Sequence, residues 1–270
     1  DLGGFSGEVP SAELYVRSAA MACFCPIMQY HAESKAEFNQ DRTPWNIAER
    51  SGDERALTGY RFYANLRMSL MPYLEREAAW CVAERQPLLR AMLLDFQSDT
   101  RAAGLWDQYM FGRNLLVAPI IREGETSREV YLPEGPWWHL FESRWYDGNQ
   151  IHQVAAALEQ IPVFLRQGAA LPLAFHHETR LGASMPSDIS GAETLVLLIA
   201  GLPPDAPLHT DELEIEASQG SVRVTSQSGR PITLVFADPP ARLELNGIVQ
   251  QPRRLSLSGG ELTAFELPAA

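Results

Sequence analysis

Cysteine is scarce in this sequence of 270 residues, which has only Cys23, Cys25 and Cys81. An odd number without framework spacing excludes a disulfide scaffold and is typical of a reducing compartment, so we expect a cytoplasmic protein. Cys23 and Cys25 with His31 would supply three ligands, whereas a closed zinc site needs four. We therefore expect buried apolar cysteines, no metal and no cofactor.

Basic residues are also few: the sequence has 22 Lys and Arg and 34 Asp and Glu, which gives a formal net charge of -12. Such a chain has no basic face for phosphate backbones and is repelled by anionic membranes. No apolar run reaches the roughly 18 residues of a spanning helix, and the nearest, ETLVLLIAGL, predicts a buried strand. We expect neither nucleic acid nor a membrane as a partner.

The whole sequence is 46% hydrophobic, which predicts a globular protein. In its first third the apolar residues recur with helical periodicity. Ser11 predicts the N-cap of a helix that runs to about Phe24, before Pro26. The short apolar IMQYH that follows predicts a buried strand, which ends at His31. A second helical stripe runs over 56–73, and Pro72 predicts a kink or a junction within it.

The sequence begins at Asp-Leu-Gly-Gly without a Met, so we expect the chain to start inside a structural element. Strand, helix, strand and helix in this order indicate parallel α/β units. Two such units cannot close a barrel or cover both faces of a parallel sheet. We therefore expect residues 1–85 to be the last two βα units of a (β/α)8 barrel, with the missing N-terminal part of the barrel as a partner.

From about Gln86 the sequence changes to short β-rich runs separated by Gly and Pro, a pattern typical of sandwiches. The Pro-, Ser- and Gly-rich stretch GASMPSDISGAE predicts a linker near residue 185. The expected fold class is thus α/β plus all-β, with a proximal β-sandwich at 86–180 and a distal one at 181–270. The stretch IPVFLRQGAALPL predicts buried strands and a hairpin in the proximal sandwich.

Candidate substrate-binding residues follow from the barrel prediction, because barrel sites lie at the carboxyl ends of the strands. Asp1, Phe5 and His31 occupy such positions. An aromatic ring can stack on the apolar face of a sugar, and a His can hydrogen-bond hydroxyl groups. The alternative is that Phe5 and His31 are core residues, the commoner fate of a single Phe or His. For Trp45 and the pair at 137–138 we expect packing roles.

A series of short motifs resembles the C-terminal half of glycoside hydrolase family 31, over roughly residues 1–175. In order they are DLGGFSG, AELYVR, FCPIMQYH, RTPW, YRFYANLRMSLMPYL, LLRAMLLDF, DQYMFGRNLLVAPII, SREVYLPEGPWWHLF and IPVFLRQGAALPL. The resemblance implies a retaining hydrolase of α-linked sugars with a barrel and two β-sandwiches, and an oligosaccharide or glycoside as substrate. It implies that Asp1 lies on the seventh barrel strand and orients a loop, that Phe5 lines the subsite of the non-reducing sugar, and that His31, on the eighth strand, hydrogen-bonds that sugar.

The catalytic residues of the resembled family are two aspartates in motifs that precede the Asp-x-Gly-Gly-Phe stretch, and neither motif occurs here. The family often has Arg two residues before the His and Gly or Asn after it, whereas this chain has Gln29 and Ala32, so the sugar preference stays open. Retaining hydrolysis needs two carboxyl groups about 5–5.5 Å apart. We expect no catalytic residue in this chain, and solvated or capping roles for Asp41 and Asp53.

A second hypothesis is that the protein is not an enzyme but a non-catalytic carbohydrate-binding or interaction module built on the β domains. It predicts sugar binding without hydrolysis by a folded chain. A truncated barrel instead predicts exposed strand edges and association with the missing segment. Gel filtration with a thermal melt separates the two.

Overall fold

A computed structural model describes residues 1–33, 41–201, 208–209, 213–218, 221–226 and 231–268. The chain divides into two compact units. Unit 1 comprises Asp1–Arg67, Glu77–Pro133 and Gln150–Val163, and unit 2 comprises Met68–Arg76, Glu134–Asn149 and Phe164–Ala270. Each helix in the described ranges falls short of the length and apolarity that crossing a membrane requires.

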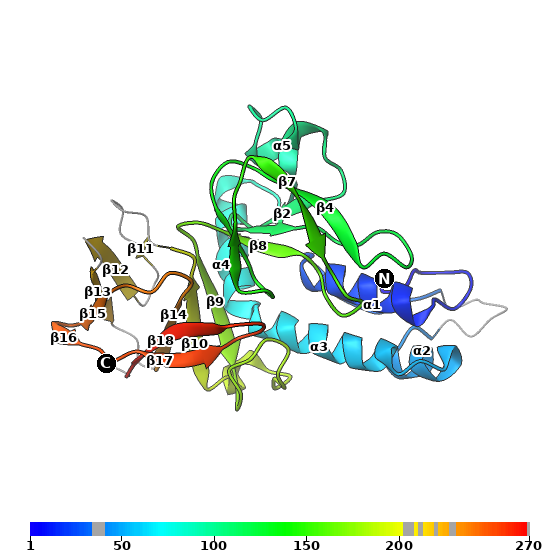
Figure 1. Cartoon of the computed structure of the whole chain (residues 1–270). Coiled ribbons are helices and arrows are strands. Elements are labelled where there is room, and N and C mark those ends of the chain that lie inside the picture. The colour runs from blue at the N-terminus through cyan, green and yellow to red at the C-terminus, as the bar shows by residue number, and fades with distance from the viewer. Residues whose placement is uncertain (34–40, 202–207, 210–212, 219–220, 227–230, 269–270) are drawn as a thin grey trace. The chain divides into compact units, whose positions relative to one another are not determined.

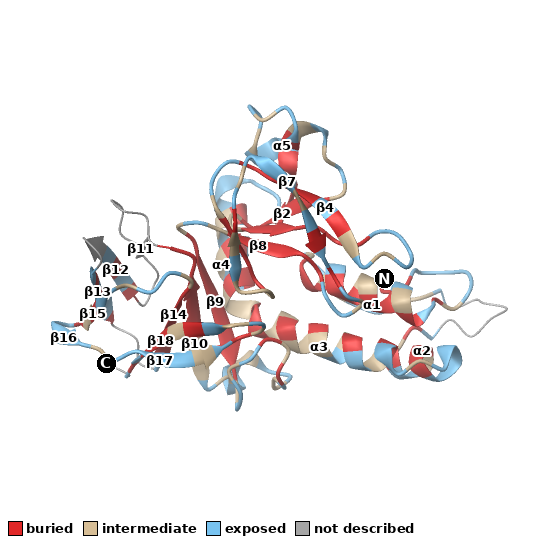
Figure 2. Cartoon of the chain, viewed as in Figure 1, coloured by how far each residue is buried: buried red, intermediate tan, exposed pale blue. Residues whose placement is uncertain are grey.

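The predicted helices of the first third are confirmed. Helix α1 (Ala12–Cys23) starts at Ser11, whose side chain accepts a hydrogen bond from the backbone N–H of Leu14 at 3.2 Å. The second stripe forms α3 (Arg55–Ser69) and α4 (Met71–Glu84), with the junction directly before Pro72. Figure 2 shows buried positions recurring along α3, as the periodicity requires.

Helix α2 (Pro44–Ser51) lies in a stretch for which no helix was predicted. Its boundaries carry recognisable signals, since Pro44 is its first residue and Gly52 ends it in the left-handed conformation, with a φ of 67°. Proline at the first helical position and glycine just after the last are common helix boundaries. These two residues could have predicted the helix.

The predicted buried strand over IMQYH is wrong. Residues 27–33 form no regular strand, and Ile27 is 71% exposed. The segment does run beside the opening of the chain, because Leu2 N–H donates to the Gln29 carbonyl at 3.1 Å and Glu33 N–H donates to the Phe5 carbonyl at 2.9 Å. A strand requires a continuous hydrogen-bond ladder, and these two bonds lie too far apart along the chain to make one.

The β-structure of unit 1 consists of short antiparallel elements. Strand β2 pairs with both β1 and β3, and β4 pairs with β7 in a separate two-stranded sheet. The elements are β1 (Leu89–Ala91), α5 (Met92–Asp95), η1 (Ala102–Gly104), β2 (Tyr109–Phe111), β3 (Leu115–Val117), β4 (Ser127–Leu132) and β7 (Gln150–Ala155). A buried carboxylate, Glu77, ties α4 to this region by accepting from the backbone N–H and the guanidinium of Arg113 at 2.8–2.9 Å.

Unit 2 contains two five-stranded sheets, ordered β17-β18-β14-β10-β9 and β11-β12-β13-β15-β16 (Figure 1). Apolar side chains of both sheets form one core, in which Leu197 and Phe236 of the first meet Ile215 and Val224 of the second. The strands are β9 (Ala170–Phe175), β10 (Thr194–Ile199), β11 (Leu208–His209), β12 (Leu213–Ser218), β13 (Ser221–Ser226), β14 (Ile232–Phe236), β15 (Arg242–Leu245), β16 (Ile248–Val249), β17 (Arg253–Ser256) and β18 (Glu261–Leu267), with η2 (Ile189–Gly191) before β10. The buried strand predicted over ETLVLLIAGL is therefore confirmed as β10.

Two predicted connections in unit 2 are corrected. The segment 176–193 is not a linker between two β domains, because it joins β9 to β10, which pair antiparallel in one sheet. The predicted hairpin in IPVFLRQGAALPL also fails, since β8 (Val163–Arg166) pairs with β5 (Trp137–His139) whereas β9 pairs with β10. Both patterns specify where a strand ends but not which strand it joins. The three-domain division itself stays a prediction.

The short strands β5 and β6 (Arg144–Tyr146) of unit 2 carry a buried histidine. His139 is 3% exposed, its ring meets that of Phe164 edge-on at 4.8 Å, and its Nδ1 accepts from Glu142 N–H at 3.0 Å. Burial lowers the pKa of His139 from 6.5 to about 4. Trp137 and Trp138 of β5 are buried, as predicted.

Acidification is expected to destabilise the fold through His139. The unfolded side chain takes up a proton near pH 6.5 and the folded one only near pH 4, so falling pH across this window favours unfolding. The free energy of unfolding should fall by up to about 3 kcal/mol, from 1.36 kcal/mol per pKa unit. Urea denaturation at a series of pH values measures it. His139→Phe should reduce the dependence of the unfolding free energy on pH, and His152→Phe should leave it unchanged. An equal pH dependence in both variants would show that His139 is not its cause.

Candidate functional site

Three residues predicted at a sugar site lie together in unit 1. His31 Nδ1 is 3.3 Å from Asp1 Oδ1, and the ring centroids of Phe5 and His31 are 5.3 Å apart. Gln29 Nε2 donates to the same oxygen of Asp1 at 3.4 Å. The backbone bonds between the opening segment and residues 29–33 hold the cluster in register. The cluster is accessible, since Phe5 is 43% exposed and the His31 side chain 61%.

Glycines shape the turn that carries Phe5. Gly3 and Gly4 have φ values of 71° and 95°, in the region that other residues rarely adopt. A side chain at Gly3 would also be obstructed, because a Cβ there would lie 2.6 Å from Pro10 Cγ. The turn is closed by Gly4 N–H, which donates to the Asp1 carbonyl at 3.0 Å. The Gly-Gly pair thus determines how Asp1 and Phe5 are presented.

The buried side chain of Arg42 supports this turn, a role that sequence analysis did not predict. The residue is 2% exposed, and its guanidinium donates to the carbonyls of Gly4, Gly7 and Glu8 at 3.1–3.3 Å. Its own carbonyl accepts from the Tyr15 hydroxyl of α1 at 2.6 Å. Burial lowers the pKa of Arg42. Arg42 opens the RTPW motif, but the motif does not reveal its role, because the atoms to which it donates are backbone carbonyls more than thirty residues away.

Aromatic side chains extend the exposed cluster. The Tyr30 ring lies 6.2 Å from that of Trp45 and 5.9 Å from that of Tyr60, both edge-on. Trp45 is 57% exposed, so the prediction that it is a packing residue is wrong for most of its surface. Helix α2 presents this ring to solvent. Exposed aromatic faces beside a hydrogen-bonding His are what a sugar-binding surface requires.

The two parts of the chain match two descriptions of one family. Residues 1–76 match the glycosyl hydrolases family 31 TIM-barrel domain, and residues 85–171 match the glycosyl hydrolase family 31 C-terminal domain. The chain belongs to glycoside hydrolase family 31. The resemblance drawn from the short motifs is therefore confirmed, and the family accounts for both the barrel-end region and the β-rich region.

Individual family 31 proteins resemble the chain over different extents. An isomaltosyltransferase from Sporosarcina globispora is 37% identical over 98% of this chain and 24% of its own length. The cycloalternan-forming enzyme from Listeria monocytogenes, solved with a pentasaccharide substrate, covers 100% of this chain and 28% of its own, with 28% identity and a TM-score of 0.85. The cycloalternan-degrading enzyme from Trueperella pyogenes, solved with a covalent intermediate, covers 63% of this chain and 24% of its own, with 41% identity and a TM-score of 0.60. The chain thus spans about a quarter of the length of these relatives.

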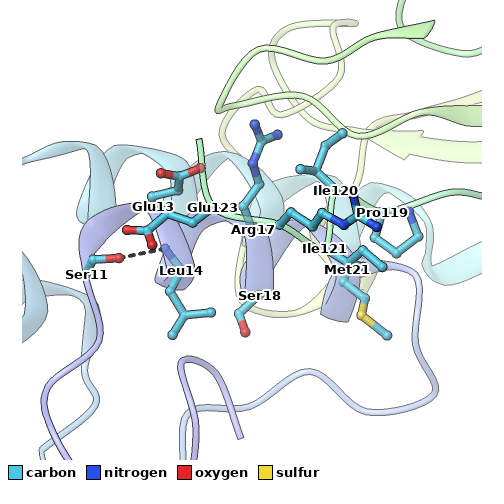
Figure 3. Close-up of a pocket in the computed structure, with 11 residues that line it drawn as sticks. Ser11, Glu13, Leu14, Arg17, Ser18, Met21, Pro119, Ile120, Ile121 and Glu123 are labelled. Atoms are coloured by element: carbon cyan, nitrogen blue, oxygen red, sulfur yellow. Dashed lines mark hydrogen bonds between the residues drawn. The ribbon is translucent and has the colours of Figure 1, made fainter. Parts of the chain in front are cut away.

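A hollow of about 420 Å³ in unit 1 of this family 31 chain has none of the predicted site residues in its lining (Figure 3). Its lining comes from Ser11, α1 and residues 119–123, with five apolar and six polar side chains. Four of its six polar side chains bond to backbone: Ser11, Glu13 and Ser18 accept from N–H groups at 2.8–3.2 Å, and Arg17 donates to the carbonyls of Glu125 and Ala157 at 2.8 Å each. These groups are engaged with backbone, so we place no chemistry in this hollow.

Asp41 and Asp53, for which solvated or capping roles were expected, each accept a local backbone hydrogen bond just before a helix. Asp41 accepts from Thr43 N–H at 2.8 Å, and Asp53 accepts from Arg55 N–H at 3.0 Å. The hydrogen bonds from Arg55 lower the pKa of Asp53. In the cluster itself Asp1 is the carboxylate that the described contacts bring to His31. One carboxylate can position a His but cannot supply both groups of a retaining mechanism.

The cysteines behave as apolar residues, as predicted, with Cys23 and Cys81 buried and all three free. Burial raises the pKa of Cys23 and of Cys25, which keeps both thiols protonated at neutral pH. A different group in unit 2 has the geometry to hold a metal ion: His176, His177 and Glu193. Sequence analysis did not single it out, because the histidines and the glutamate are far apart in the sequence.

Proposed function

We propose that this chain is part of a retaining family 31 enzyme that transfers isomaltosyl units between α-glucans. The observation that carries the proposal is the extent of similarity. The isomaltosyltransferase and the cycloalternan-forming enzyme match nearly the whole chain, whereas the cycloalternan-degrading enzyme matches 63% of it. Similarity that continues through the last hundred residues favours the transferring enzymes.

The retaining mechanism is supported by the covalent intermediate with which the degrading relative was solved. A glycosyl-enzyme intermediate is the defining species of a retaining enzyme, and it can be resolved by water or by a sugar hydroxyl. The two aspartates that form and resolve it belong, in this proposal, to polypeptide outside this sequence. In this proposal residues 1–85 are the end of the barrel and the β-rich remainder forms the two sandwiches, the second of which includes β9 because β9 pairs with β10.

Within the proposed pocket each residue has a role that its contacts support. Phe5 stacks on the apolar face of the terminal sugar, and His31 hydrogen-bonds its hydroxyl groups. Asp1 holds the His31 ring through the 3.3 Å contact to Nδ1, which leaves Nε2 for the sugar. A reducing compartment, which suits three free cysteines, remains part of the proposal.

The product pattern tests the transfer reaction. The longer polypeptide that carries the paired aspartates is incubated with panose, which offers an isomaltosyl group, and products are separated by anion-exchange chromatography. New saccharides longer than panose are expected early in the reaction. If only isomaltose and glucose are released at all panose concentrations, the enzyme is a hydrolase and the proposed transfer reaction is wrong.

His31→Ala in the same polypeptide tests the binding role. Loss of hydrogen bonds to the substrate should lower kcat/KM by about 10- to 100-fold, corresponding to roughly 1.4–2.7 kcal/mol. His31→Gln keeps a side-chain donor and should recover part of that loss. His152→Ala, which removes a histidine of β7, serves as the matched control. A His31→Ala enzyme within twofold of wild type would show that the cluster does not contact substrate.

A further inference from the structure

A pair of adjacent histidines and one glutamate meet at one end of the β9–β10 pair in unit 2. Phe175, the last residue of β9, is opposite Thr194, the first of β10, and Glu193 N–H donates to the Phe175 carbonyl at 2.9 Å. The next residues beyond this pair are His176 on one strand and Glu193 on the other. The sheet register therefore fixes where these side chains start.

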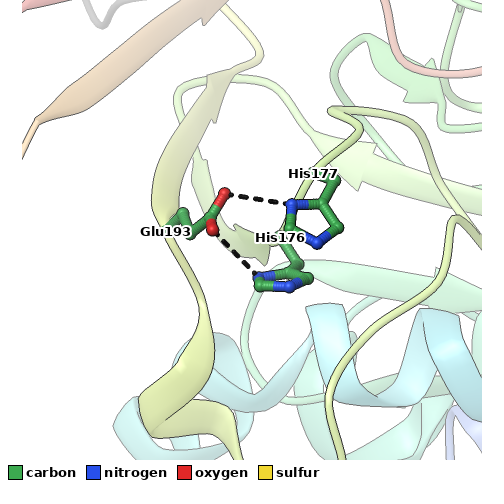
Figure 4. A group of neighbouring side chains, drawn as sticks. All are labelled: His176, His177 and Glu193. Atoms are coloured by element: carbon green, nitrogen blue, oxygen red, sulfur yellow. Dashed lines mark ion pairs between the residues drawn. The ribbon is translucent and has the colours of Figure 1, made fainter.

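The three side chains point toward one another (Figure 4). Nδ1 of His176 lies 3.6 Å from one carboxylate oxygen of Glu193, and Nδ1 of His177 lies 3.5 Å from the other. One ligand atom from each residue falls within a 4.8 Å span. Bonds of about 2.0–2.2 Å to a tetrahedral ion place neighbouring ligand atoms roughly 3.3–3.5 Å apart. Both N–O distances are close to this spacing and too long for a direct hydrogen bond.

The histidine rings make a simple ion pair a poor account of the cluster. Their centroids are 3.6 Å apart with a tilt of 40°, so two protonated rings would repel each other. His176 Nδ1 is also shielded from solvent and has no hydrogen-bond partner among the described residues. The lone pair of His176 Nδ1 faces the Glu193 carboxylate, and the His177 ring lies beside it. One cation between these three groups would give each of them a partner.

We propose that His176, His177 and Glu193 bind one divalent transition-metal ion, with Zn²⁺ as the best match. Neutral imidazole with one carboxylate suits zinc, whereas calcium and magnesium prefer shells of oxygen ligands. Three protein ligands leave a fourth position for water at this accessible site. The ion would fasten the start and the end of the long connection 176–193 to each other. This inference does not depend on the proposed enzymatic reaction.

Calorimetric titration of the full chain with ZnCl₂ tests the site. One equivalent is expected to bind with a Kd in the micromolar range or tighter, and the melting temperature should rise with added Zn²⁺. His177→Asn and Glu193→Gln should each weaken binding at least tenfold. Two matched controls should bind as wild type: Glu178→Gln, which removes a nearby carboxylate paired with Arg180, and His152→Asn in unit 1.

Cobalt substitution gives a second readout that does not depend on stability. Co²⁺ at the proposed site should give the visible absorption of tetrahedral nitrogen and oxygen ligation, without the thiolate charge-transfer band that cysteine ligation would add. Absence of binding up to about 1 mM Zn²⁺ would overturn the proposal. So would unchanged affinity in both His177→Asn and Glu193→Gln, or a thiolate band, since each would place the ion elsewhere.

Discussion

Aryl α-glucosides and α-xylosides are expected to release no aglycone above the buffer rate when incubated with the isolated 270-residue chain. Retaining hydrolysis requires a nucleophile and an acid/base about 5–5.5 Å apart. The candidate site offers Asp1, which contacts His31 and Gln29, whereas Asp41 and Asp53 accept local backbone hydrogen bonds. Without the pair the chemical step loses its acceleration, which is at least about 10⁶-fold in enzymes.

The measurement needs proof that the chain is folded and free of contaminants. Circular dichroism should show the mixed helix and strand content, and a mock preparation from cells without the gene should set the background. Turnover above that background that disappears in Asp1→Asn would contradict the prediction. It would mean that this chain contains a catalytic group of its own.

Arg42→Met should be the most damaging single substitution among those considered for unit 1. It keeps most of the buried stem but removes the donors to the carbonyls of Gly4, Gly7 and Glu8. Hydrogen bonds to charged groups contribute about 1.5–3 kcal/mol each, and they are not additive. Because these loop carbonyls can partly regain water, we expect a loss of about 3–4 kcal/mol in the free energy of unfolding, measured by urea denaturation.

Two arginine variants control for charge and for geometry. Arg61→Met removes an exposed arginine of α3 and should change stability by less than about 0.5 kcal/mol. Arg42→Lys keeps the charge, but a single ammonium cannot reach three carbonyls as a guanidinium does, so it should rescue little. A loss below about 1 kcal/mol in Arg42→Met would show that the turn holds without this residue.

Prediction succeeded where a local signal decides the structure. Helix α1 starts at its Ser11 cap, and the α3–α4 junction falls at Pro72, because capping and proline sterics act within one helical turn. Prediction failed where a partner strand decides. The apolar content of IMQYH is compatible with a strand, but strand formation needs a ladder that this segment does not have.

The candidate site divides in the same way. Asp1, Phe5 and His31 could be named as candidates because the motifs resemble a known family, although the strand expected to end at His31 does not form. Arg42 could not be, since what makes it important is burial against backbone carbonyls. His176 and Glu193 could not be paired either, because only the β9–β10 register brings them opposite each other.

The sequence alone determined the family, the start of α1 at Ser11, the α3–α4 junction at Pro72 and the buried strand β10. These follow from residue order and short-range sterics, which do not depend on distant contacts. The tertiary structure decided that the opening segment and residues 29–33 present one accessible cluster, that 176–193 joins two strands of one sheet, and that two histidines meet a glutamate there. Each of these depends on hydrogen bonds between residues far apart in the chain, and such pairings are selected by the whole fold.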